Sequence, residues 1–269
     1  MSENESYLFQ VSTTGVWGNI TEPFAETIPV QASLALPQTG GFGTARVDRF
    51  DFRGILSFES AEALVSGSGT GNCHDSTATV TITGLNILNV VTADRVVARI
   101  ASEQSRGPGR PGLISALGSS FENLRIAGYP VQPELDTDKF HELDAGQSLT
   151  AAREKNQQFH TASQALASSR TRFKEYLDKC LSRFHPESAE PGSPAICSLV
   201  RGMEWGSKLP ADLQPLGHVI HVRGFGFIRL AEFRITRNTR SITMLQVDLG
   251  SSPSGSNGSG NASGGGSDP

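Results

Sequence analysis

His218 and His221 supply two imidazoles, side chains that commonly bind transition metals, at a spacing of three residues. On a helix this spacing brings both rings to one face, whereas on a strand it sends them to opposite faces. The β-branched residues Val219, Ile220 and Val222 around them favour a strand. We therefore expect structural or surface histidines here, and the sequence predicts no metal site.

Cys73, His74 and Asp75 bring a nucleophile, a base and a carboxylate together in adjacent positions. A catalytic triad is assembled from residues that are distant in sequence and close in space, so adjacency is the wrong geometry. The tripeptide follows the Gly-rich stretch 67–72, and we expect it to lie in a polar loop. The remaining chemical interpretation of the tripeptide is that Cys73 is an exposed thiol that is sensitive to oxidation.

The three cysteines, Cys73, Cys180 and Cys197, are far apart in the chain and odd in number. A disulfide framework needs a denser and even set, so we interpret them as reduced thiols, with one disulfide pair plus a free thiol as the alternative.

The segment Gly224-Phe225-Gly226 lacks the strand–turn–helix context and the third glycine of a dinucleotide-binding loop. It predicts instead a strand that another backbone approaches closely. The sequence also contains no GxSxG, HExxH, Walker-type or EF-hand motif. No cofactor is predicted, and no catalytic residue is identified from a motif.

An enzyme with a site built from dispersed residues is nevertheless compatible with the sequence, because catalytic groups need only meet in space. The ionisable residues from which such a site would draw are His141, His160, His218, His221, Glu232 and Asp94.

The C-terminal strands have a local excess of positive charge against Glu232 alone, which comes from Arg229, Arg234, Arg237 and Arg240. They form either a solvated hairpin face or a contact surface for a glycan or another anion. The net charge of the whole chain is −4, which argues against a general nucleic-acid binder.

The elements that must position these residues are mostly strands. Residues 76–83 alternate cleanly, with Ala78, Val80 and Ile82 on one face, and residues 93–102 alternate in the same way. We expect 47–58 to be one strand in which Gly54 marks either a bulge or a close approach of another backbone, and clusters at 40–41, 67–69 and 106–112 to separate strands. Residues 1–135 and 209–249 together predict a mainly β domain, an antiparallel sandwich or open barrel.

Residues 136–208 interrupt this pattern. Over 149–184 the apolar residues recur at spacings of three, four or seven, which predicts an amphipathic helix, and they are Phe159, Ala162, Leu166, Phe173, Tyr176, Cys180 and Phe184. Every Lys of the chain (139, 155, 174, 179 and 208) also lies in this part. The helix either covers a face of the sheet or binds a protein partner, including a second copy through a coiled-coil seam.

The two ends of the chain predict no structure of their own. Residues 250–269 are almost wholly Gly, Ser, Asn and Pro, which predicts a flexible tail. The acidic first residues are not a secretory signal, and no apolar run approaches the ~20 residues of a membrane helix. As supplied, the chain is expected in the cytoplasm, or in the envelope or outside the cell if an export signal has been removed.

Two stretches resemble the core of the β-rich bacterial "choice-of-anchor" type proteins. These are Thr83–Leu88 with Val91–Asp94, and Gly118–Val131, in which a strand and a turn recur in a similar form. The resemblance spans about residues 40–131 and, more loosely, 225–249. It implies an extracellular or envelope β domain without an established activity, and no functional residue is transferred from it. The chain departs from these proteins in its Lys-bearing helical segment and in having no signal peptide or anchor.

Together these features predict a non-enzymatic structural or binding module of bacterial type. It is expected to assemble with itself or bind a partner through residues 149–184, and the enzyme with a dispersed site is the alternative.

Overall fold

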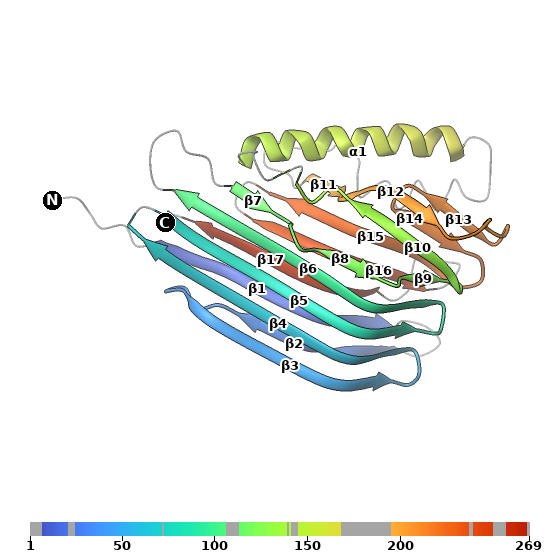
Figure 1. The fold of residues 1–269 in the computed structure, drawn as a ribbon, viewed down its shortest axis with the longest axis horizontal. Coiled ribbons are helices and arrows are strands. Elements are labelled where there is room, and N and C mark those ends of the chain that lie inside the picture. The colour runs from blue at the N-terminus through green and yellow to red at the C-terminus, as the bar shows by residue number, and fades with distance from the viewer. Residues whose placement is uncertain are drawn as a thin grey trace.

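Two antiparallel sheets lie face to face, and helix α1 (Ala145–Ala167) runs beside them in the computed structural model (Figure 1). The structure describes residues 7–20, 25–71, 73–105, 113–138, 140, 145–167, 195–236, 239–249 and 257–267. The architecture is the predicted sandwich, and both sheets keep open edges.

The first sheet has eight strands in the order β13-β14-β15-β16-β17-β1-β2, with β11 pairing with β15. Its strands are β1 (Leu8–Ile20), β2 (Glu26–Ala35), β11 (Ala195–Ser198), β13 (Leu213–Leu216), β14 (Val219–Val222), β15 (Gly226–Ile235), β16 (Arg240–Leu249) and β17 (Asn257–Ser267).

The second sheet has nine strands in the order β12-β10-β9-β6-β5-β4-β3, with β7 and β8 pairing with β6. Its strands are β3 (Gly41–Phe52), β4 (Leu56–Thr70), β5 (Cys73–Ile87), β6 (Val91–Ser105), β7 (Leu113–Ser115), β8 (Ser120–Glu122), β9 (Arg125–Ile126), β10 (Tyr129–Leu135) and β12 (Val200–Trp205).

The predicted alternation builds the core between the sheets. In β5, Ala78, Val80 and Ile82 are buried, and their neighbours on the opposite face are half-buried. Their partners on the adjacent strand β4 are Val65, Ala63 and Ala61, and all three are 0% exposed. Small and branched side chains therefore interdigitate, and each fully buried Val or Ile contributes about 1.5–3 kcal/mol relative to an exposed one.

Three predictions about strand ends are wrong. Gly54 lies in the turn between β3 and β4 with φ of 66°, where its amide donates to Asp51 Oδ1, and it is not a bulge. The Gly67–Gly69 cluster lies inside β4, and Cys73–Asp75 begins β5 instead of forming a loop. At Gly67–Gly69 and Cys73–Asp75 the long β4–β5 ladder continues past residues that locally favour turns, because backbone pairing outweighs a weak local preference. At Gly54 the local preference for a turn is followed, and the chain reverses there.

The segment predicted to be helical, 136–208, has a mixed structure. Helix α1 spans Ala145–Ala167, and β11 and β12 (195–205) return the chain to both sheets by pairing with β15 and β10. Residues 168–194, with Phe173, Tyr176, Cys180 and Phe184 of the predicted helix, lie outside the described residues.

The C-terminal stretch predicted to be a flexible tail includes strand β17. Residues 257–267 pair antiparallel with β1 on one side and with β16 on the other. A Gly- and Ser-rich segment carries no side chains that specify this placement, so the hydrogen-bonding groups of the two neighbouring backbones define it. Residues 250–256 lie outside the described part of the chain.

Gly226 confirms the predicted close approach of another backbone. Its φ is +139°, and a Cβ there would overlap the carbonyl oxygen of Asp248 on β16. Gly226→Ala is therefore expected to lower the free energy of unfolding by about 2–3 kcal/mol. At Gly224, with φ of +78°, a Cβ meets nothing within 4 Å. Gly224→Ala should then cost only about 1 kcal/mol in the same chemical denaturation experiment, and equal losses would contradict the role of the overlap.

Candidate functional site

A group of charged side chains is buried on β15 and β16. Arg229, whose side chain is 2% exposed, donates from Nη2 to Asp248 Oδ2, and its Nε lies 3.8 Å from Glu232 Oε1. Its sequence neighbours Ile228 and Leu230 are both fully buried. Because successive side chains of a strand point to opposite faces, Arg229 occupies the face opposite theirs.

Helix α1 brings further groups to the same place. The Phe159 ring packs 4.4 Å from the His218 ring, and Lys155 Nζ lies 3.6 Å from Asp136 Oδ2. His218 is 5% exposed. We refer to Asp136, Lys155, His218, Arg229, Glu232 and Asp248 as the charged cluster.

Burial lowers the pKa of His218 to about 3, and the positive charges of Arg229 and Lys155 act in the same direction. The imidazole is therefore neutral at physiological pH. Two carboxylates lie beside Arg229, so its buried guanidinium is paired with negative charge. The ion pair of Lys155 with Asp136 and the packing of Phe159 on His218 thus hold α1 against the rest of its own domain.

Of the six ionisable residues proposed for a dispersed catalytic site, two meet in the charged cluster, namely His218 and Glu232. His221 packs its ring 4.5 Å from that of Phe227, and burial lowers its pKa. Asp94 lies on the other sheet and accepts a hydrogen bond of 2.6 Å from Asn123. The side chain of His160 and the whole of His141 lie outside the described residues.

The Cys73–Asp75 tripeptide is divided between two surroundings. The His74 ring stacks on Tyr7 at 4.0 Å and 6° between planes, whereas Cys73 Sγ lies 3.8 Å from Glu103 Oε1. Alternation along β5 therefore separates the thiol from the imidazole. Cys73 is half-buried and Cys197 is buried, and Cys180 lies outside the described part.

The arginines predicted to contact a glycan or another anion differ in their surroundings. Arg240 is 6% exposed, and its Nη1 donates to the carbonyl oxygens of Thr236 and Thr239 in its own hairpin. Burial lowers its pKa. Arg234 is exposed, and Arg237 lies outside the described residues. Arg240 thus stabilises the β15–β16 turn, which leaves Arg234 as the described solvent-facing charge of the three.

Neither a metal site nor a membrane helix is found in the part of the chain that is described. It contains no group of three or more His, Cys, Asp or Glu residues able to hold a metal ion. Within the same residues, no helix has the length and apolar character needed to cross a bilayer.

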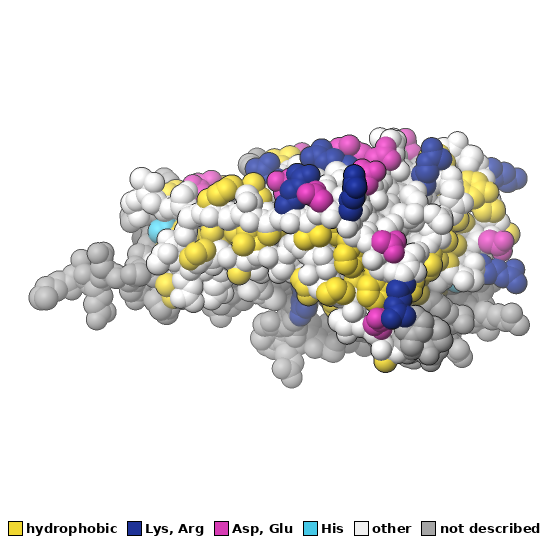
Figure 2. All heavy atoms as spheres, turned by 90° about the horizontal axis from the view of Figure 1, so that it is seen from below, with side chains coloured by type: hydrophobic (Ala, Val, Ile, Leu, Met, Phe, Trp, Pro, Cys, Tyr) yellow, Lys and Arg dark blue, Asp and Glu magenta, His cyan; other side chains and the backbone are white. Residues whose placement is uncertain are grey.

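The long side of the sandwich formed by β2 and β3 is incompletely covered. Seen from this side, hydrophobic side chains form a band along the molecule (Figure 2). The half-buried apolar residues of β2 and β3 that pack against the core are Leu34, Ala45, Val47, Phe50 and Phe52. We call these five residues, with Phe42 at 68% exposed, the open edge. Sequence reasoning missed it, because alternation in 41–52 predicts an apolar face and does not reveal that the strand ends a sheet.

Strand β3 has a second feature, which is its order of charges. Arg46 and Asp48 form an exposed ion pair of 2.9 Å, Arg49 follows with φ of 54°, and Asp51 and Arg53 come next. Asp48 pairs with Ser60 and Phe50 with Phe58, so the register is the same on both sides of Arg49, while the alternation of half-buried and exposed residues changes phase there. Charges on an edge strand disfavour pairing with unrelated strands.

Comparison with known families gives one match. The family model for a domain of unknown function, DUF8256, matches residues 7–236. No curated protein and no solved structure matches the chain. The match does not bear on the resemblance of residues 40–131 to choice-of-anchor type proteins, which stays a prediction.

Proposed function

The chain belongs to the DUF8256 family, and we propose that it is a non-enzymatic structural and binding module that associates with a second copy of itself through the open edge. The observation that carries the proposal is the band of half-buried apolar side chains along a sheet edge (Figure 2). Contiguous apolar surface of this kind on a folded protein marks a contact site more often than it marks ordinary surface.

The sequence of β3 supports a second copy as the partner. In an antiparallel approach about a two-fold axis between Asp48 and Arg49, Arg46 stands opposite Asp51 of the second copy. The same axis sets Val47 against Phe50 and Ala45 against Phe52. In a regular strand such pairs would lie on opposite faces, but the alternation changes phase at Arg49, so that both members of each apolar pair are half-buried and Arg46 and Asp51 are both exposed. The edge is therefore self-complementary in both charge and apolar character, as an isologous interface requires.

The described part of α1 favours this edge over the helix as the contact surface. Ser148 and Ala152 are 0% exposed and pack on the chain's own domain, whereas Arg153, Glu154 and Gln157 are exposed. A polar outer face does not form an apolar seam. The sequence predicts partner binding through residues 149–184. Of these, residues 168–184 lie outside the described part of the chain, so the comparison with the open edge concerns residues 149–167 alone.

Arg46→Glu tests the self-association. Each copy then presents a carboxylate to Asp51 of the other, so two attractive pairs become repulsive. Exposed pairs are worth up to about 1 kcal/mol each, and we expect the dissociation constant of the dimer to rise about tenfold. Light scattering over a range of protein concentrations measures it.

Arg95→Glu is the matched control for this substitution. Arg95 forms an exposed ion pair of 3.0 Å with Glu122 on β8, at a place remote from the β3 edge in strand order. It should leave the dissociation constant of the dimer unchanged. A full-length protein that stays monomeric at all concentrations, or equal effects of the two substitutions, would count against the proposal.

A further inference from the structure

Arg240 is a buried cation that has no negative partner among the described residues. It is the first residue of β16, and only 6% of it is exposed. Arg229, the other buried arginine of the described chain, lies beside two carboxylates. A charge that leaves water without a counter-charge is costly. Arg240 therefore has the same need for a negative partner as Arg229, and the described residues do not meet it.

The hydrogen bonds of Arg240 use one side of its guanidinium. Nη1 donates to the carbonyl oxygens of Thr236, at 2.7 Å, and of Thr239, at 3.0 Å. Nε is buried and has no hydrogen-bond partner in the described part of the chain. The planar edge formed by Nε and Nη2 is one that binds a carboxylate or a phosphate through two parallel hydrogen bonds. Nη1 thus anchors Arg240 to its turn, and the Nε–Nη2 edge stays available to an acceptor.

The acceptors of the described turn residues are already in use. The Thr239 carbonyl oxygen accepts from the Thr236 amide and hydroxyl as well as from Arg240. The two threonine hydroxyls lie 2.7 Å apart, and Thr236 Oγ1 also accepts from the Thr239 amide. Residues 233–242 contain three arginines and neither Asp nor Glu. A negative partner for Arg240 therefore has to come from outside this hairpin.

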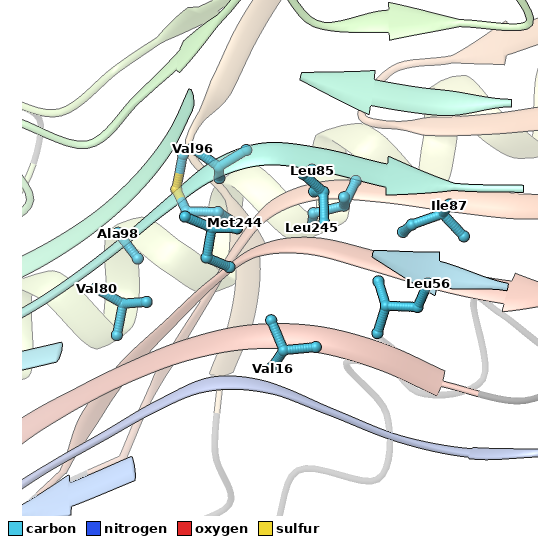
Figure 3. A pocket seen from close by; sticks show the side chains of 10 residues that line it. Val16, Leu56, Val80, Leu85, Ile87, Val96, Ala98, Met244 and Leu245 are labelled. Atoms are coloured by element: carbon cyan, nitrogen blue, oxygen red, sulfur yellow. The ribbon is translucent and has the colours of Figure 1, made fainter. Parts of the chain in front are cut away.

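The core beside Arg240 is apolar. By alternation Arg240 shares the core face of β16 with Ile242, and its partner on β15 is Ile235, both 0% exposed. Further along β16, Met244 and Leu245 line a cavity of about 30 Å³ whose other lining residues are also apolar. Figure 3 shows these side chains between the two layers. Because Arg240 begins the strand, a partner reaches its guanidinium from the end of the sandwich.

We propose that the Nε–Nη2 edge of Arg240 is a binding site for an oxyanion, namely a carboxylate, sulfate or phosphate group that comes from outside the chain. Each of these groups presents two oxygens that match the two parallel N–H donors. The bound oxyanion supplies the counter-charge that the two carboxylates supply at Arg229.

The rest of the hairpin favours an anion at this end of the molecule. Arg234 is exposed and pairs with Ser241, whereas Arg240 pairs with Ile235, so the two arginines lie on opposite faces. Arg234 therefore attracts an anion through its charge and does not contact the same group. The site is distinct from the open edge, and the proposal goes beyond the proposed function.

Sulfate is the first probe of the site. Urea unfolding of the full chain is measured at rising concentrations of sodium sulfate, with sodium chloride holding the ionic strength constant. An ion that binds only the folded state raises the equilibrium constant for folding, and we expect a rise of about elevenfold at ten times the dissociation constant. Sulfate also stabilises proteins through its exclusion from their surface, but that effect is shared by all variants of the chain.

Variants of the two arginines separate a bidentate site from simple charge. Arg240→Gln removes the cation, and Arg240→Lys keeps the charge without the planar edge. Both should reduce the specific rise to less than about twofold, because an ammonium cannot form the two parallel hydrogen bonds. Arg234→Gln is the matched control, since it removes a charge of the same hairpin from the opposite face. It should keep most of the rise, because exposed charges are screened by salt.

Calorimetric titration of sulfate into the unaltered folded protein makes the test independent of the stability of the variants. We expect saturable heat with one site per chain. Sodium phosphate and sodium acetate in the same titration then identify the group: a response to acetate assigns a carboxylate, and a response to sulfate and phosphate alone assigns a tetrahedral anion.

Absence of a saturable response to all three ions would overturn the proposal, as would equal responses of Arg240→Gln and the unaltered protein. Arg46→Glu should leave the response to sulfate unchanged. A failure at Arg240 is therefore distinguishable from a failure of self-association at the open edge.

Discussion

Replacing Arg229 with Met is expected to lower the free energy of unfolding by about 3–5 kcal/mol. Asp248 and Glu232, whose side chains are 18% and 12% exposed, would keep their charge without the guanidinium that now pairs with them. Removing one member of a buried ion pair costs more than the pair itself contributes, because the desolvated partner is left uncompensated. Urea denaturation monitored by circular dichroism measures the change.

Two further variants make the Arg229 prediction specific. Adding Glu232→Gln and Asp248→Asn to Arg229→Met removes the two carboxylate charges that Arg229 no longer compensates. Most of the lost free energy of unfolding should then return. Arg201→Met is the surface control, since Arg201 pairs with Glu134 at 3.2 Å while its side chain is 71% exposed. It should cost less than about 1 kcal/mol. A small loss of stability for Arg229→Met, or no recovery in the triple variant, would show that Asp248 and Glu232 do not depend on Arg229 for compensation of their charges.

His218 should make the protein less stable as the pH falls. Its pKa is about 3 in the folded protein and 6.5 when unfolded. Between these values the unfolded chain binds a proton that the folded chain excludes, so the free energy of unfolding falls by about 1.4 kcal/mol for each pH unit. The contribution of His218 is complete above 6.5 and declines as the pH drops toward 3. At about pH 5 the loss should reach about 2 kcal/mol.

His218→Gln isolates this effect from that of other titrating groups. The free energy of unfolding of the variant should depend less steeply on pH below about 6.5, by one proton. His221→Gln is the control, because His221 is half-buried and its pKa is lowered by burial alone. It should change the slope in the same direction but by less. Parallel pH profiles for His218→Gln and the unaltered protein would mean that the buried imidazole titrates normally.

The strands were predictable because their information is local. A residue pattern of period two, as at Ala78, Val80 and Ile82, specifies which face is buried whatever the partner strand. The close approach at Gly226 was predictable for a similar reason, since a glycine within an apolar strand has few other uses. The spacing of His218 and His221 also predicted that their rings point to different sides. In the structure the His218 ring packs on Phe159 and the His221 ring on Phe227.

The charged cluster was only partly predictable. His218 and Glu232 were among the candidates, but Arg229, Lys155 and Asp248 were not joined to them. They come from α1, β15 and β16, and their meeting depends on where the helix packs, which no local pattern encodes. Alternation places Arg229 on the face opposite Ile228, and it does not say that a helix will cover that face.

The sequence by itself determined the β class, the alternation of the core strands and the presence of a helix between them, because side-chain periodicity follows from backbone geometry. The tertiary structure alone decided which strands end a sheet and which lie inside it. Strand β3, with an apolar face, ends a sheet, and β17, with none, lies in the middle of one. The physical reason is that hydrogen-bonding partners are chosen between distant segments, and a backbone can pair whether or not its own side chains contribute to the core.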